Sequence, residues 1–86
     1  MHEMGIASSI LEAVEKDMLR YPGHRAAKVG VRIGDFAGVD GESLRFCFDV
    51  IVKGTPAEPL ELTIEASAGD ELDLSWIEID DLEEAA

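Results

Sequence analysis

The sequence has little positive charge, a single cysteine and no long apolar run. Seven lysine and arginine residues stand against nineteen aspartate and glutamate residues, which gives a net charge of −12 over 86 residues. A chain this acidic repels phosphate backbones and offers no basic stripe, so we expect no nucleic-acid binding. One cysteine cannot form an internal disulfide, and no basic segment followed by an apolar run opens the chain. We therefore expect a cytoplasmic protein.

Apolar runs are too short for a membrane protein. No stretch approaches the roughly 18 uninterrupted apolar residues that a membrane-spanning helix needs, so we expect a soluble chain without membrane contact. The length allows one core and one site. We place a single domain at residues 1–80 and an acidic C-terminal tail at residues 81–86.

Two segments carry apolar residues at the spacing of a helix face. The first runs from Met4 to Tyr21 and is ended by Pro22-Gly23, because proline cannot continue the hydrogen-bond ladder. The second begins at Asp40, a capping residue, and stops at Gly54. It is apolar over much of its circumference, so we expect it to be well buried. Its apolar residues are Leu44, Phe46, Cys47, Phe48, Val50 and Ile51.

Three other segments alternate apolar and polar residues, as strands with one buried face do. They lie at residues 27–33, 60–64 and 72–79. A shift in the phase of the last one at Trp76-Ile77 indicates a β-bulge. His24, in a Gly-His-Arg sequence, is expected in the loop before the first strand.

The order helix, strand, helix, strand, strand predicts an α+β fold. We expect a two-layer sandwich in which a three-stranded mixed sheet packs on two helices. The strand–helix–strand passage should cross over right-handed and make its strands parallel, and the last two strands can pair as an antiparallel hairpin. A hydrophobic edge strand would permit a homodimer.

Three segments in this order resemble a known family. The chain opens Met-His-Glu-Met, residues 29–39 read VGVRIGDFAGV, and residues 44–50 read LRFCFDV. Together they resemble the HypA/HybF family of hydrogenase-maturation nickel chaperones, over residues 1 to about 80. The resemblance implies that Met1, His2 and Glu3 hold Ni(II). It also implies delivery to a maturation GTPase and then to the [NiFe]-hydrogenase large subunit.

The family's zinc domain has no counterpart in this sequence. Family members carry it between the second and third strands, built on two Cys-x-x-Cys pairs. Here only residues 66–70 stand at that place, and the chain has one cysteine. We therefore expect the nickel-binding domain alone, without structural zinc.

A histidine at position two is chemically suited to binding a metal. The α-amine of Met1, the backbone nitrogen of His2 and its imidazole lie on one short covalent path and form a chelate. Ni²⁺ and Cu²⁺ accept square-planar nitrogen donors, and Glu3 could add a backbone nitrogen or a carboxylate oxygen. Copper should bind more tightly than nickel, so selectivity must come from metal availability and partner contacts.

Other residue types that carry chemistry have simpler explanations. His24 could be an auxiliary imidazole ligand, but a loop histidine is usually solvated. Cys47 stands between two phenylalanines and is expected as a small buried hydrophobe. Trp76 is expected in the core or at a partly covered edge, with a partner surface as the alternative.

Nothing in the sequence assembles a catalytic site. Asp40, Glu42 and Asp49 suggest paired carboxylates, but they fit an N-cap and a helix surface better. Without a triad, a metal-activated water motif or a cofactor loop, we expect no enzyme. The alternative to a nickel metallochaperone is a metal-free protein-interaction module, an adaptor in the same maturation machinery, whose acidic surface sets partner choice.

Overall fold

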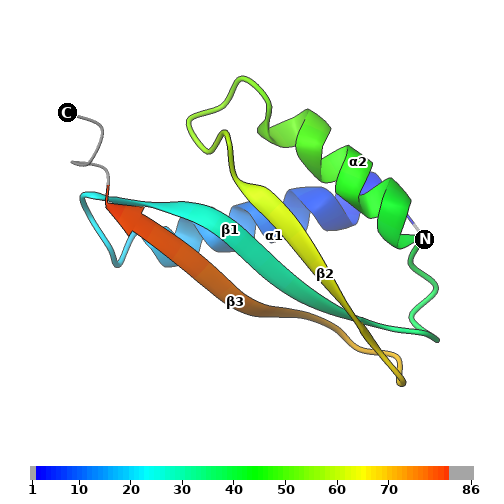
Figure 1. Ribbon diagram of the computed structural model, residues 1–86. Coiled ribbons are helices and arrows are strands. Elements are labelled where there is room, and N and C mark those ends of the chain that lie inside the picture. The colour runs from blue at the N-terminus through cyan, green and yellow to red at the C-terminus, as the bar shows by residue number, and fades with distance from the viewer. Residues whose placement is uncertain (1, 82–86) are drawn as a thin grey trace.

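The computed structural model describes residues 2–81, and within them five elements follow one another. These are α1 (Glu3–Met18), β1 (His24–Gly34), α2 (Gly41–Val52), β2 (Glu61–Ser67) and β3 (Leu72–Asp81). Both helices lie against one face of the sheet, so the fold has two layers (Figure 1). The predicted α+β class and element order are confirmed. Of the predicted acidic tail, residues 82–86 lie outside the described part of the chain.

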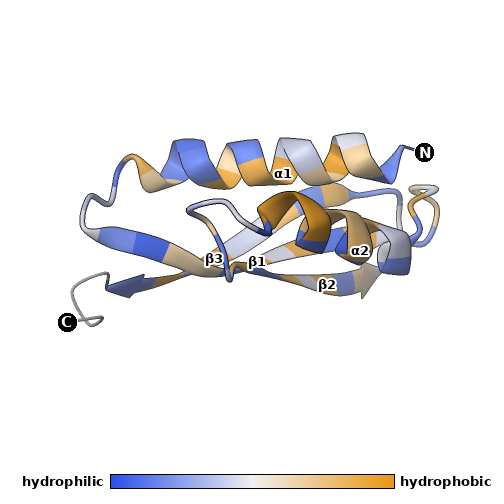
Figure 2. Cartoon of the chain, turned by 90° about the horizontal axis from the view of Figure 1, so that it is seen from above, coloured by the Kyte–Doolittle hydropathy of each residue, from blue (hydrophilic) through white to orange (hydrophobic). Residues whose placement is uncertain are grey.

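Helix α1 packs on the sheet through one stripe. Ala7, Ile10 and Val14 are buried, at the spacing that brings them onto one face. Figure 2 shows the hydrophobic parts of α1 turned toward the sheet and the hydrophilic parts turned away. The helix ends at Met18, earlier than predicted, because the next residues form a turn in which the Tyr21 N–H donates to the carbonyl of Met18 at 2.9 Å.

Strand β1 begins earlier than the sequence indicated. Gly23 adopts a φ of +82°, which reverses the chain directly after that turn. His24 and Arg25, expected in a loop, lie in β1 opposite Asp81 and Asp80 of β3. The prediction of a loop at His24 was wrong. These polar residues show no apolar alternation that would indicate a strand, but their cross-strand partners hold them in the sheet.

Helix α2 has one buried face and one exposed face. Leu44, Phe48 and Val52 are buried, at a spacing of one helical turn. Phe46 and Val50 are 69% and 48% exposed. The expectation of a well-buried helix was therefore wrong for this outer face. A two-layer fold has no third layer to cover it.

The strand order is β2-β1-β3, with β1 parallel to β2 and antiparallel to β3. The parallel pair was predicted, but the hairpin of β2 with β3 was wrong. The connection at residues 68–71 passes the end of β1 instead. There the Gly34 N–H donates to the carbonyl of Glu71 at 2.8 Å, and the Phe36 N–H donates to the carbonyl of Gly69 at 2.9 Å.

The charges of the strands favour the central place of β1. On the sheet face away from the helices, each of two basic residues of β1 has an acidic register partner on both sides. In the order β2–β1–β3 these triplets are Glu61–Lys28–Glu78 and Glu65–Arg32–Asp73. A hairpin of β2 with β3 would have set acidic strands beside each other, which is unfavourable.

The predicted β-bulge lies next to Trp76. Gly30 pairs with Trp76, but Val31 pairs with Leu74, so Ser75 is the extra residue of β3. The indole lies directly over Gly30, where any Cβ would overlap it. Its N–H donates to a carboxylate oxygen of Glu65 at 3.3 Å. Trp76 is thus a half-buried residue on the face of the sheet away from the helices.

Candidate functional site

The N-terminus of α1 lies beside the N-terminus of α2. The backbone N–H of Asp40, the N-cap of α2, donates to a carboxylate oxygen of Glu3 at 3.0 Å. His2 is exposed directly before the helix. Two of the three predicted nickel residues therefore share one end of the two-helix layer, whereas Met1 lies outside the described residues.

The backbone of His2 takes part in the first hydrogen bond of α1, whereas its imidazole ring does not cap the helix. The residue is extended, with φ −89° and ψ 91°, and its side chain makes no capping hydrogen bond. Its carbonyl accepts the first helical hydrogen bond, from the Ile6 N–H at 3.2 Å. The first N–H groups of a helix have no partner in the helical ladder, so the backbone nitrogens of His2 and Glu3 are not committed to it.

The carboxylate of Glu3 is held in its charged form. Its pKa is lowered from the ordinary value, first by the hydrogen bond from the Asp40 N–H and then by its own backbone N–H. An ionised carboxylate next to exposed His2 offsets the positive end of the α1 dipole, which would otherwise oppose a cation. The chemistry available here is capture of a divalent cation by nitrogen donors beside a fixed negative charge.

Asp40 belongs to this site more closely than sequence reasoning indicated. Its carboxylate caps α2 as predicted, accepting from the N–H groups of Glu42 at 3.1 Å and Ser43 at 3.3 Å. Its own N–H fixes Glu3 from 37 residues away along the chain. A capping signal was readable in the sequence, but the contact with Glu3 required the fold.

The second histidine lies at the opposite end of the molecule. His24 follows the turn after the C-terminal end of α1, and Figure 1 shows that turn far from the N-terminus. Its ring Nδ1 lies 3.2 Å from the carbonyl oxygen of Pro22. An auxiliary role for His24 beside His2 is therefore wrong. Within residues 2–81, no three or more His, Cys, Asp or Glu residues gather as a metal site.

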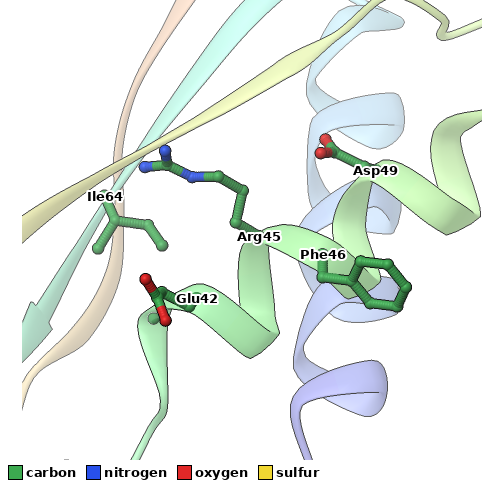
Figure 3. Close-up of a pocket in the computed structure, with 6 residues that line it drawn as sticks. Glu42, Arg45, Phe46, Asp49 and Ile64 are labelled. Atoms are coloured by element: carbon green, nitrogen blue, oxygen red, sulfur yellow. The ribbon is translucent and has the colours of Figure 1, made fainter.

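Cys47 and the carboxylates of α2 have structural positions. Cys47 packs against the core but is only half-buried, less than expected for a small buried hydrophobe. A cavity of about 580 Å³ lies between α2 and β2, where Arg45 extends toward Ile64 and Phe46 points away (Figure 3). Glu42 and Asp49 are exposed on the surface of α2 at this cavity.

A comparison with protein families now adds to this geometry. Residues 1–78 match a family described as "Hydrogenase/urease nickel incorporation, metallochaperone, hypA". The family that matches this chain is thus one of metallochaperones, and its members are not enzymes. The chain belongs to the HypA family. The resemblance noted in the sequence and the expectation of no enzyme are both confirmed.

Individual relatives agree with the family match. The chain is 44% identical over 69 residues to the hydrogenase maturation factor HypA of Chlorobaculum tepidum, covering 80% of this chain and 61% of that protein. It is 47% identical over 68 residues to HypA of Chlorobium limicola, covering 79% of this chain and 59% of that protein. HypA of Methanopyrus kandleri is 39% identical over 69 residues, covering 80% of this chain and 49% of that protein. The chain therefore spans about half to three fifths of these relatives.

Neither helix among the described residues is long and apolar enough to cross a membrane.

The connection between β2 and β3 stands where the resemblance placed a zinc domain. Residues 68–71 form this connection directly.

Proposed function

We propose that this chain carries one Ni(II) ion as cargo, bound at its amino terminus by Met1, His2 and Glu3. One observation carries the proposal. In a chain of the HypA family, exposed His2 lies next to a Glu3 carboxylate that the Asp40 N–H holds in its charged form. The donors are the α-amine of Met1, the backbone nitrogen and imidazole of His2, and a nitrogen or oxygen of Glu3. Ni²⁺ accepts such a nitrogen-rich, square-planar set.

The proposed role is delivery of nickel in the maturation of [NiFe] hydrogenase. Relatives of this chain are named hydrogenase maturation factors, and the family description names nickel incorporation. We propose a maturation GTPase as the first receiver and the hydrogenase large subunit as the final one, in the cytoplasm. The domain would do this without structural zinc, since a single cysteine cannot supply the two Cys-x-x-Cys pairs of the family's zinc domain.

Calorimetric titration of the tag-free full chain with NiCl₂ tests the site. We expect one nickel ion per chain, and loss of that binding in His2→Ala. The same loss is expected when four residues are added before Met1, because the α-amine then lies too far along the chain from His2 to share one chelate with it. His24→Ala is the matched control and should bind nickel like the wild-type protein, because His24 lies at the far end of α1. Equal binding by all four proteins would remove the proposed site.

A metal-free adaptor is the second candidate function. The observation that favours it is the outer face of α2, where Phe46 and Val50 are 69% and 48% exposed. The discriminating measurement is binding to a purified maturation GTPase. Binding that His2→Ala and a chelator leave unchanged, but Phe46→Ser abolishes, would favour the adaptor over the metallochaperone.

A further inference from the structure

An apolar groove runs along α1 on the side of β3. Leu72 and Leu74 of β3 are 39% and 40% exposed, and they line the groove together with Ala13 of α1. Two cavities of about 420 and 630 Å³ adjoin there and share Ala13 and Leu74. His2 borders the first cavity, and Leu19 borders the second, whose rim also carries the charged residues Lys16, Asp17 and Arg20. The groove therefore starts at the candidate metal site and follows α1 to its far end.

Strand β3 forms the outer wall of this groove and is an edge strand. The order β2-β1-β3 leaves its outer side without a neighbouring strand in the described part of the chain. An edge strand presents backbone N–H and carbonyl groups to which an extended segment can add. Such a segment would place every second side chain in the groove, against Leu72 and Leu74.

The charges on β3 determine what kind of segment fits. On the face away from the groove, β3 carries Asp73, Glu78 and Asp80, separated by Trp76 and the bulge. A second copy pairing through its own β3 would set these acidic residues beside acidic residues, which destabilises cross-strand pairs. A segment with basic side chains at the alternate positions would meet them with opposite charge. The groove thus favours a chain of alternating basic and apolar residues.

We propose that the partner that receives the metal docks on β3, adding a strand of alternating basic and apolar residues to the sheet. Its apolar side chains fill the α1–β3 groove, and its basic side chains face Asp73 and Asp80. The groove begins at His2, so the docked strand lies next to the metal-bearing terminus, where transfer takes place. This last step rests on the proposed function, whereas docking itself does not.

A synthetic peptide tests the docking surface. The probe is a fluorescein-labelled peptide of alternating lysine and valine with the ten-residue length of β3. Its binding to the nickel-free full chain is followed by fluorescence anisotropy at low and high salt. We expect binding that weakens with salt, and no binding of a peptide with glutamate in place of lysine. Backbone amide NMR signals of β3 and of His2 should shift, and those of β2 should not.

Variants on β3 show whether the groove is responsible. Leu74→Asp should weaken peptide binding by about tenfold or more, since it puts a charge into the apolar groove. Asp73→Asn combined with Asp80→Asn should also weaken it, and it sets no lysine beside Arg32 or Arg25, the register partners of these residues. The matched control is Glu12→Gln combined with Glu15→Gln, two exposed positions of α1 outside the groove. Circular dichroism of each variant checks that it is folded.

Three outcomes would overturn the proposal. They are no binding of the lysine–valine peptide, an equal loss in the control pair, and a homodimer of this chain that Leu74→Asp dissolves. Nickel titration of Leu74→Asp separates docking from metal binding. We expect unchanged nickel affinity, because Leu74 supplies no donor. A wild-type chain that binds the peptide but no nickel would retain the docking surface and lose the proposed metallochaperone function.

Discussion

Glu3 has two roles at the residue scale, since it lies beside the proposed metal donors and joins two helices. Its carboxylate accepts from the Asp40 N–H, and this contact lowers its pKa. A carboxyl group whose pKa is lowered by folding contributes stability above its unfolded pKa, about 4.3 for glutamate. That contribution is lost as the pH falls through the lowered, folded-state pKa. Acidification should therefore loosen the contact between α1 and α2.

We predict that Glu3→Gln changes how stability depends on pH. Glutamine can still accept from the Asp40 N–H but carries no charge, so the variant should be less stable than the wild-type protein at neutral pH. The difference should vanish at acidic pH, where Glu3 is protonated as well. Urea unfolding followed by circular dichroism, from neutral pH down to about pH 3, measures it. Glu12→Gln, on the exposed face of α1, is the control. Parallel profiles for wild type and Glu3→Gln would contradict the prediction.

Sequence alone predicted only the part of the candidate site whose residues are adjacent along the chain. Met1, His2 and Glu3 are adjacent, so their chelate chemistry needs no tertiary structure to be recognised. Asp40 was identified as a helix cap, but its bond to Glu3 spans 37 residues and depends on how the helices pack. His24 was weighed as a ligand because sequence alone could not place it at the other end of the molecule.

At the element scale, periodicity predicted which segments become helices and strands, because burial of one face imposes it. The ends of elements were less readable. Helix α1 ends before Pro22 because the chain already turns at Leu19, and β1 begins in polar residues that cross-strand partners hold. The exposed Phe46 shows the limit of composition, since an apolar residue on a helix can lie on either face.

The crossing at the end of β1 depends on glycine, and it gives a second prediction. A Cβ at Gly34 would overlap the backbone carbonyl of Gly69, which cannot rotate away. Gly34→Ala should therefore lower the free energy of unfolding by about 2 kcal/mol, as overpacking does. Thermal unfolding measures the loss. Gly5→Ala in α1, where nothing lies within 4 Å of the added Cβ, should instead raise stability by about 0.5 kcal/mol. Equal melting temperatures for wild type and Gly34→Ala would contradict this account.

At the scale of the whole molecule, the strand order could not be read from periodicity. All three strands alternate in the same way, and a short connection between β2 and β3 is typical of a hairpin. The charge pattern is a feature of the sequence that favours the observed order. The basic residues Lys28 and Arg32 lie on the one strand that has acidic strands on both sides. In a chain with a net charge of −12, three of the seven lysine and arginine residues lie in this central strand.

Reversing one of those bases tests this explanation. Lys28→Glu would place a third acidic residue between Glu61 and Glu78, so we expect a loss of about 1 kcal/mol in the free energy of unfolding. Lys53→Glu at the end of α2 changes the net charge equally but lies outside the sheet, and it should cost less. Urea unfolding at low and high salt measures both. Salt should reduce the difference between the two variants, because exposed charges are screened. If Lys53→Glu were as destabilising as Lys28→Glu, total charge rather than strand order would be the cause.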